Sequence, residues 1–404
     1  TSVPANRGTM APRSRRAFRP RAMDARKPVP ADVVVIGGGV MGMSAAYHLA
    51  HRGASVTLLE SEPMFGTGST ALNAGGFRHQ FSTAVNIELS KLSLALLMRF
   101  EEEFEQPIGY TPCGYLFLLD SDADIAAFRQ NVTLQHAHGV QTQWLSAAEA
   151  GALAPQVNMD GITAATFYDR DGLVDPNSVL QGYVRGASRA GAQLRSGVRV
   201  TGARVRGGHI EALETTVGDV SGGTYLLAAG PWSGVVGRSL GVDVPVAPIR
   251  RQIAVTAPIP GITKQFPFVI DFARSLYFHH EGGAILTGMS KHDEPPGFDT
   301  RVDEGWRETH VMAAMERLPL LAESAIAHEW AGLYEVTPDH QPIIGRLPAL
   351  ENLYACTGFS GHGLMHGPAA GLAVTEEILD GAAHTVDIAP LRWRTFGAGE
   401  YNVV

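Results

Sequence analysis

Residues 32–60 read DVVVIGGGVMGMSAAYHLAHRGASVTLLE and hold the strongest structural signal of the chain. The β-branched run VVVI at 33–36 predicts a strand that is buried on both faces. Gly37, Gly39 and Gly42 then form a G-x-G-x-x-G turn that opens a helix. The first glycine permits the tight turn, the second lets a pyrophosphate approach the helix N-terminus, and the third lets the helix lie close to the sheet.

A second predicted strand, SVTLL, follows the helix end at Gly53 and stops at Glu60. An acid at this distance from the glycines is suited to bind a ribose hydroxyl. Strand, glycines, helix, strand and acid in this order predict a Rossmann-like dinucleotide-binding unit. NAD and FAD both carry an adenosine ribose with a free 2′-hydroxyl, so the unit alone leaves the choice between them open.

Composition limits the class of protein. At 404 residues, with 45% hydrophobic and 18% charged residues, the chain is long enough for two domains. A net charge of −8 argues against a nucleic-acid partner, and the two cysteines match no metal or redox spacing. No apolar run reaches the roughly 18 residues of a membrane span. We expect a cytoplasmic metabolic enzyme, preceded by a basic N-terminal arm over residues 1–30.

Three further segments contain many small residues where a long ligand could approach the backbone. FGTGSTALNAGGFRHQFS at 65–82 predicts a loop, and TYLLAAGPWS at 224–233 predicts a buried strand with a small-residue end. GFSGHGLMHGPAAG at 358–371 follows the predicted strand NLYACTG. In this last segment we expect Pro368 to be the first residue of a helix that runs to Leu379, before Gly381.

These motifs, taken together with AGLYEVTPDHQPIIG at 331–345, resemble the D-amino-acid-oxidase superfamily of flavoproteins over residues 32 to about 385. Glycine oxidase, sarcosine oxidase, dimethylglycine dehydrogenase and proline dehydrogenases are the most similar members. The resemblance implies FAD as the cofactor. It also implies noncovalent binding, because Leu72 and Gly332 stand where relatives place a linking His or Cys.

The resemblance implies a place for each part of FAD. Ser69 and Thr70 are expected near the phosphates, residues 74–76 beside the isoalloxazine, Val198 against the adenine, and Ala229 with Gly230 near the ribityl chain. The helix start in 358–371 would stabilise the anion of the reduced flavin. The predicted cofactor-binding residues are Gly37, Gly39, Val40, Met41, Gly42, Glu60, Ser61, Gly68, Ser69, Thr70, Ala74, Gly75, Gly76, Val198, Ala229, Gly230, Trp232, Gly332, Gly358, Gly361, His362, Gly363 and Leu364.

The predicted fold class is α/β with an α+β second domain, a Rossmann-like FAD-binding domain interleaved with an antiparallel-sheet substrate domain. Segments 110–120, 245–257 and 275–290 alternate as strands of that sheet. Leucines and phenylalanines at helical spacing in 82–105, and Asp175 followed by Pro176, predict two helices. We assign 31–108, 150–244 and 328–404 to the FAD-binding domain, and 109–149 with 245–327 to the substrate domain.

Relatives mostly oxidise amino acids or N-alkylglycines to imines, so the resemblance implies an FAD-dependent amine oxidase or dehydrogenase. Hydride transfer to flavin N5 would give an imine that hydrolyses, with the electrons passing to O2 or another acceptor. Such a substrate requires an arginine for its carboxylate. Glycine-oxidase relatives carry an arginine at each of the positions of Tyr334 and Gly361. Because this chain lacks both, we expect Arg78 to bind the carboxylate instead, with Arg274 and Arg250 as further candidates.

The predicted catalytic residues are Arg78, His79, Tyr277, Tyr334 and His362. His279 and His366 are weaker candidates, and no metal site is expected. Lys291 lies just beyond the strand AILTG, where some sarcosine oxidases keep a lysine for O2 activation. Two other functions stay open: a 2-hydroxy-acid dehydrogenase, and an electron-transferring or assembly flavoprotein. The expected partners are a small amine or amino acid and an electron acceptor, with a homo-oligomer or a partner subunit also possible.

Overall fold

The strand, turn and helix predicted at 32–60 are present in the computed structural model, which describes residues 30–397 and 399–401. They are β1 (Ala31–Ile36), α1 (Val40–His51) and β2 (Val56–Leu59). The third glycine acts as predicted, because a Cβ on Gly42 would lie 2.0 Å from the carbonyl oxygen of Gly37. The predicted N-terminal arm, apart from Pro30, lies outside the described residues.

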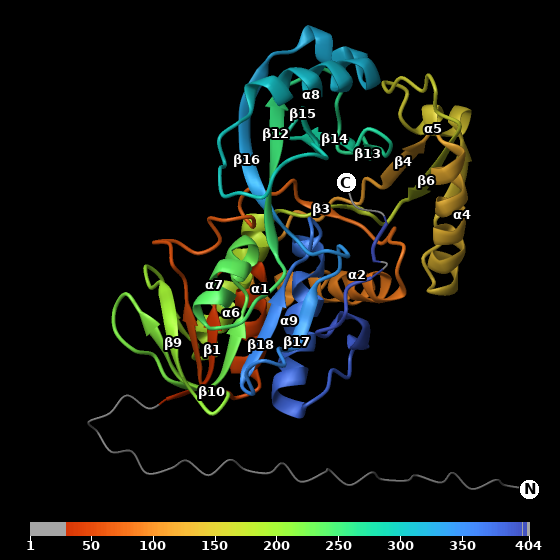
Figure 1. Cartoon of the computed structure of the whole chain (residues 1–404). Helices are drawn as coiled ribbons and strands as arrows, with labels where there is room; N and C mark the ends of the chain where they lie inside the picture. The colour runs from red at the N-terminus through yellow and green to blue at the C-terminus, as the bar shows by residue number, and fades with distance from the viewer. Residues whose placement is uncertain (1–29, 398, 402–404) are drawn as a thin grey trace, which may run out of the picture. The chain divides into compact units, whose positions relative to one another are not determined.

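The strands β1 and β2 belong to a six-stranded sheet (Figure 1). Its strands are parallel except β17, which runs antiparallel to β18. In spatial order it contains β17 (Ile343–Arg346), β18 (Leu353–Thr357), β11 (Gly222–Leu227), β1, β2 and β8 (Gln193–Arg195). The predicted strands at 224–233 and 352–358 are therefore neighbours of each other, and their carboxyl ends meet the glycine turn after β1.

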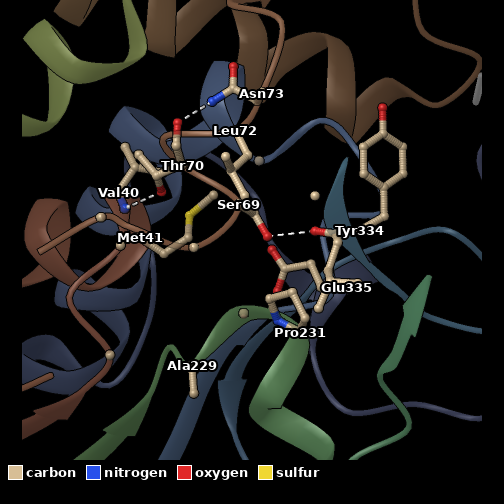
Figure 2. Close-up of a pocket in the computed structure, with 18 of the residues that line it drawn as sticks. Val40, Met41, Ser69, Thr70, Leu72, Asn73, Ala229, Pro231, Tyr334 and Glu335 are labelled. Atoms are coloured by element: carbon tan, nitrogen blue, oxygen red, sulfur yellow. Dashed lines mark hydrogen bonds between the residues drawn. The ribbon is translucent and has the colours of Figure 1, made fainter. Parts of the chain in front are cut away.

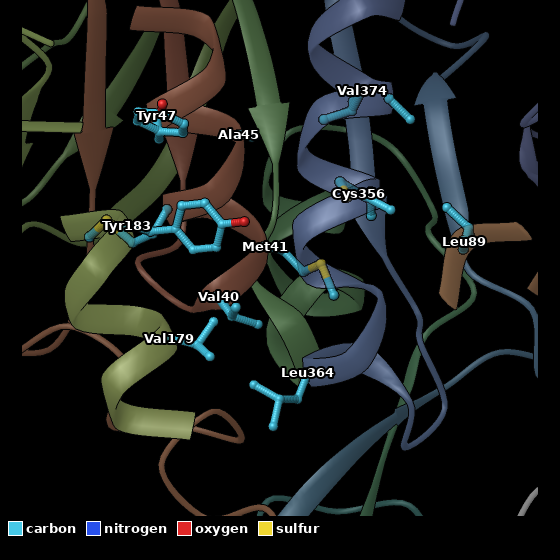
Figure 3. Packing of buried hydrophobic residues seen from close by; sticks show 14 of the residues in the cluster. Val40, Met41, Ala45, Tyr47, Leu89, Val179, Tyr183, Cys356, Leu364 and Val374 are labelled. Atoms are coloured by element: carbon cyan, nitrogen blue, oxygen red, sulfur yellow. The ribbon is translucent and has the colours of Figure 1, made fainter. Parts of the chain in front are cut away.

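Three helices pack together on one face of this sheet, with α1 between α6 (Pro176–Arg189) and α9 (Gly363–Asp380) (Figure 3). Asp175 caps α6 as predicted by accepting a hydrogen bond from the Ser178 amide. The region 82–105 forms two helices, α2 (Ala84–Leu97) and α3 (Phe100–Phe104), and most of its predicted apolar stripe is buried.

The start of α9 differs from the prediction. The helix begins at Gly363, so Pro368 lies inside it and is not its first residue. Two of the glycines in this segment serve the contact between helices and not the ligand. A Cβ on Gly371 would lie 2.1 Å from Ser44 Oγ, and one on Gly367 would lie 3.0 Å from the Val40 side chain. Only glycine allows α9 to approach α1 this closely.

The second sheet has eight strands and includes all three predicted segments. It is mixed, because β13 pairs with β4 in parallel while its other pairs are antiparallel. Its strands in spatial order are β16 (Ile326–Val336), β12 (Ala247–Thr256), β15 (Ala284–Met289), β14 (Leu276–Glu281), β13 (Phe268–Asp271), β4 (Tyr115–Leu119), β6 (Ala164–Tyr168) and β5 (Gln143–Ser146). The strands β6 and β16 lie here, although residues 150–244 and 328–404 were expected in the other domain. The pairing of β6 with β4 joins segments distant in sequence, which a local pattern does not reveal.

The remaining elements connect or cover the two sheets. The hairpin at residues 200–215 turns at Gly207 and Gly208. In the part of the chain that the structure describes, no helix has both the length and the apolar character needed to cross a membrane. The elements that connect or cover the two sheets are β3 (Gly76–Phe77), α4 (Asp122–Ala137), α5 (Ala147–Leu153), β7 (Gly172–Leu173), β9 (Val200–Arg206), β10 (His209–Thr215), η1 (Gly230–Trp232), α7 (Ser233–Ser239), α8 (Glu304–Arg317), η2 (Pro319–Glu323) and η3 (Ala389–Leu391).

Candidate active site

One cavity of about 890 Å³ extends from the glycine turn after β1 to a face of the eight-stranded sheet. We call the part next to β1, α1 and β2 the cofactor end, and the part under the eight-stranded sheet the substrate end. The long strands β12 and β16 run side by side and contribute residues to the substrate end (Figure 1).

The cofactor end is built mainly from backbone groups. The Gly38 amide donates to Glu60 Oε2 at 2.7 Å, which fixes the acid at the end of β2. The hydroxyl of Thr70 accepts a hydrogen bond from the Val40 amide at 3.1 Å, so its own hydrogen is free to donate to a ligand (Figure 2). A Cβ on Gly39 would lie 3.2 Å from Thr70 Oγ1 and would narrow this cradle. The arrangement fits the pyrophosphate and ribose of a dinucleotide.

Most predicted cofactor-binding residues line this cavity. Three do not, and each has a role in packing or turning the chain. Gly42 contacts Gly37 as described above, and Gly75 adopts a φ of +73° against the Val174 carbonyl. Gly358 has a φ of +83° and donates its amide to Glu335. Those that line the cavity are Gly37, Gly39, Val40, Met41, Glu60, Ser61, Gly68, Ser69, Thr70, Ala74, Gly76, Val198, Ala229, Gly230, Trp232, Gly332, Gly361, His362, Gly363 and Leu364.

Three tyrosines form much of the substrate end, and each lies over a glycine. Tyr277 and Tyr334 are predicted site residues, whereas Tyr115 was not recognised. A Cβ on Gly361 would lie 2.4 Å from the Tyr334 ring, and one on Gly288 would lie 2.3 Å from the Tyr277 hydroxyl. A Cβ on Gly76 would likewise clash with the Tyr115 hydroxyl. The Phe268 ring stacks on Tyr115 at 4.1 Å and completes an aromatic wall.

Arg251 is the cation on this wall, and sequence reasoning missed it. It lies on β12 beside Arg250, and adjacent strand residues point to opposite faces, so only one of the pair faces the cavity. The guanidinium carbon lies 5.2 Å from the centre of the Tyr334 ring, and one nitrogen donates to the Arg250 carbonyl. Burial lowers the pKa of Arg251. No ion pair links it to an acid among the described residues, so it is suited to bind an anionic group of a ligand.

Arg78 also lines the cavity, as predicted, but it is more deeply enclosed. Its guanidinium lies 4.0 Å from the centre of the Phe81 ring and donates to the Gln80 carbonyl at 2.6 Å. Burial lowers the pKa of Arg78, while the charges of Glu400 and Asp171 oppose this shift. The structure therefore brings two arginines to one cavity.

His79 does not line the cavity, so the prediction that its side chain belongs to the site is wrong. Its amide and its ring Nδ1 both contact Asp171 Oδ1, at 2.7 and 2.8 Å. Asp171 is fully buried, and its other oxygen contacts the Gln80 amide group at 3.2 Å. This network anchors the chain directly after residue 78, so His79 acts on the site through the backbone.

His362 does line the cavity, directly before α9. Its side chain is buried, and Nε2 has no hydrogen-bond partner among the described residues. Burial, together with the nearby charge of Arg78, holds the pKa of His362 well below its usual value. A neutral imidazole with one free nitrogen is suited to a hydrogen bond with a ligand.

The other candidates from sequence lie elsewhere. Arg250 pairs with Glu294 at 2.9 Å, and Arg274 pairs with Glu316 at 2.8 Å. Lys291 pairs with Asp303 at 3.2 Å and does not line the cavity. His279 is buried against Phe268 of the wall, whereas His366 is buried in α9 and contacts Ser90 of α2; neither lines the cavity. Within the described residues, no group of three or more metal-ligating side chains is found.

Glu335 is a further cavity residue that the sequence analysis missed. It follows Tyr334 on β16, and its Oε2 accepts hydrogen bonds from the Thr357 hydroxyl and the Gly358 amide, both at 2.8 Å. Its place between the two ends of the cavity is visible in Figure 2. A glutamate in the segment AGLYEVTPD was the only available signal, and an isolated acid on a strand has no diagnostic pattern.

Comparison with known proteins agrees with this geometry. Residues 32–377 match the family model described as DAO, FAD dependent oxidoreductase. FAD-dependent oxidoreductase domain-containing protein 1 of Xenopus laevis is 31% identical, covering 92% of this chain and 84% of that protein. Mitochondrial dimethylglycine dehydrogenase of Mus musculus is 29% identical over 92% of this chain, which spans 45% of that protein. The crystal structure of L-proline dehydrogenase from P. horikoshii has a TM-score of 0.83 and 31% identity, covering 89% of this chain and 96% of that one.

Proposed function

Because the chain belongs to the DAO family of FAD-dependent oxidoreductases, we propose that it oxidises the C–N bond of an amino acid or an N-substituted glycine. One observation carries the proposal. Arg251, a half-buried cation without an acidic partner among the described residues, lies at the substrate end of the same cavity that begins at the dinucleotide turn. A carboxylate is the group that such a guanidinium binds best.

The residues of the substrate end would hold the substrate as follows. Arg251 binds the carboxylate, and the hydroxyls of Tyr277 and Tyr334 donate further hydrogen bonds to it. The aromatic wall excludes water, and among the described residues the wall itself presents no acid that would stabilise a charged amine. Bound FAD would supply the acceptor for a hydride from the carbon next to the amine, and the resulting imine would hydrolyse.

The relatives support an amine substrate that carries a carboxylate. Dimethylglycine and L-proline, named for two of the similar proteins, both combine a carboxylate with an alkyl-substituted nitrogen. Because this chain spans less than half of the dimethylglycine dehydrogenase, the proposal concerns only the amine oxidation that this cavity could perform.

The proposal is tested by anaerobic titration of the FAD-loaded protein. The panel contains glycine, sarcosine, dimethylglycine, L-proline and lactate, and the readout is bleaching of the flavin absorbance, followed by its recovery in air. We expect bleaching with at least one of the amines and none with lactate. Bleaching by lactate alone would support a 2-hydroxy-acid dehydrogenase, to which Arg251 is equally suited. No bleaching with any compound would favour an electron-transferring or assembly protein.

A matched pair of variants separates substrate binding from general damage. Arg251→Met should lose bleaching at substrate concentrations that saturate the wild type, while retaining FAD. Arg250→Met, on the opposite face of the same strand, should bleach like the wild type. Equal behaviour of the two variants would contradict the role of Arg251.

A further inference from the structure

The carboxyl group of Glu335 is an acid inside the cavity that the proposed oxidation does not use. Its Oε2 accepts hydrogen bonds from the Thr357 hydroxyl and the Gly358 amide, and the backbone of Phe359 also acts on this carboxyl group. No ion pair links it to a described lysine, arginine or histidine. An ionised carboxylate in a cavity that a ligand closes to water would lack a counter-charge.

The position of Glu335 is midway along the cavity. Its Oε1 lies 3.7 Å from the point where a Cβ on Gly363 would stand, and Met41 of the first turn of α1 lies 3.4 Å from the same point. On the other side its neighbour in the strand is Tyr334, which belongs to the substrate end. In Figure 2 the side chain extends between Ser69 and Pro231.

The chemistry of a flavin dinucleotide determines what reaches this position. Its phosphates suit the backbone cradle at α1, and its reactive ring must face the substrate end. The part between them is a polyol chain, whose hydroxyl groups both donate and accept hydrogen bonds. A carboxylic acid directed at the middle of the cavity therefore faces hydroxyl groups.

We propose that Glu335, in its protonated form, donates a hydrogen bond to the polyol chain of bound FAD, so that FAD binding is coupled to the uptake of one proton. This inference rests on the proposed function only in taking FAD as the cofactor.

The groups around Glu335 favour the protonated form. Burial raises the pKa of Glu335 and outweighs the hydrogen bonds from the Gly358 backbone, the Thr357 side chain and the Phe359 backbone, which favour the ionised form. The titratable neighbours are Cys356 on β18, Tyr334 on the same strand and His362 before α9. Burial raises the pKa of Cys356 and of Tyr334 and lowers that of His362, so all three are uncharged near neutral pH. The start of α9 supplies only a fraction of a positive charge.

Bound FAD would exclude water from the cavity and so raise the pKa of Glu335 further. An acid with a higher pKa in the complex takes up a proton on binding, and the affinity then falls as the pH rises. The dissociation constant of FAD should therefore increase by up to about tenfold per pH unit above the pKa of the free protein.

The first experiment measures FAD affinity, by the quenching of flavin fluorescence, from about pH 5.5 to about pH 8.5. We expect the wild type to lose affinity over this range and Glu335→Gln to bind FAD with little dependence on pH. Glu329→Gln is the matched control, because Glu329 lies on the same strand and pairs with Arg307 outside the cavity. Equal pH dependence of the wild type and Glu335→Gln would overturn the inference.

The second experiment needs no variant. FAD is added to the apoprotein in weak buffer with a pH indicator, and the protons taken up are counted per FAD bound. Uptake that approaches one proton supports the inference, and binding without proton uptake at any pH in the range overturns it. Failure of the proposed function looks different, because FAD would then bind with proton uptake but no amine would bleach it.

Discussion

The two ends of the cavity are built in different ways. The cofactor end is organised around one continuous segment, residues 31–60, whose backbone amides and glycines face the cavity, and the segments 61–70, 198–201 and 228–232 complete it. The substrate end comes from side chains on the strands β4, β12, β13, β14 and β16, which are up to about two hundred residues apart in sequence. The difference suggests that the cofactor end tolerates almost no added atoms. At the substrate end, by contrast, a single side chain can be replaced while the others stay in place.

The largest effect should come from adding one methyl group to the cofactor end. In Gly37→Ala the new Cβ would lie 2.3 Å from the Ala228 carbonyl oxygen at a φ of +114°. Because neither backbone can yield locally, we expect a loss of about 3 kcal/mol or more in the free energy of unfolding, and no retained FAD. Thermal unfolding and the flavin absorbance after gel filtration measure the two effects.

Gly53→Ala is the control for backbone conformation alone. Gly53 has a φ of +89°, but a Cβ there would meet no atom within 4 Å. We expect a cost of about 1 kcal/mol with FAD retained. If Gly37→Ala behaved like Gly53→Ala, the close contact after β1 would not matter, and the contrast between the two ends would lose its basis.

The second largest effect should come from one side chain at the substrate end. Arg251→Met is expected to reduce kcat/KM by about 10² to 10³, or roughly 3 to 4 kcal/mol, because the substrate carboxylate loses its charged partner. FAD affinity should not change. Arg251→Lys should recover only part of the loss, because a lysine offers a point charge in place of the planar fork. Full activity of Arg251→Met would contradict the proposed anchor.

The same contrast explains what could be predicted from the sequence. The dinucleotide unit was predicted in detail, because a strand, three glycines and an acid within thirty residues fix each other's positions. The carboxylate anchor was expected at Arg78, with Arg250 in reserve, and Arg251 was missed. The sequence pair Arg250 and Arg251 predicts that one of them faces each side of the strand, but not which side faces the cavity. That choice depends on the pairing of β12 with β16 and β15.

The start of α9 illustrates the same limit. The glycines of 358–371 all look alike in sequence, yet Gly363 lines the cavity while Gly367 and Gly371 allow contact with α1. Proline is favoured in the first turn of a helix, so Pro368 suggested a start five residues too late. Only the packing of α9 on α1 distinguishes these roles, and it joins segments more than three hundred residues apart.

A smaller effect is expected from a single hydroxyl at the substrate end. Tyr277→Phe should reduce kcat/KM by about fivefold to tenfold, near 1 kcal/mol, because one hydrogen bond to the carboxylate is lost while the ring stays in place. Tyr354→Phe, on β18 and outside the cavity lining, should leave kcat/KM unchanged. A loss as large as that of Arg251→Met would mean that Tyr277 takes part in the reaction itself.

The smallest effect near neutral pH should come from His279, which supports the substrate end from behind. Its ring stacks on Phe268 at 4.8 Å, its Nδ1 donates to the His280 carbonyl, and its buried Nε2 has no partner among the described residues. Burial lowers the pKa of His279 to about 4. The folded state therefore disfavours the charged form, and stability that is complete above about pH 6.5 is lost as the pH falls towards 4.

Replacing this side chain should make the protein less sensitive to acid. Between about pH 6.5 and about pH 4, the unfolding free energy of His279→Gln should fall less steeply than that of the wild type, by up to about 1.4 kcal/mol per pH unit. Near pH 6 the difference is below about 1 kcal/mol. His384→Gln is the control, because it removes an imidazole that is exposed. Denaturant unfolding at several pH values measures the slopes. Parallel curves of unfolding free energy against pH for the wild type and His279→Gln would show that the wall at Phe268 does not depend on a neutral imidazole behind it. Backbone pairing would then stabilise the substrate end more than the contrast with the cofactor end implies.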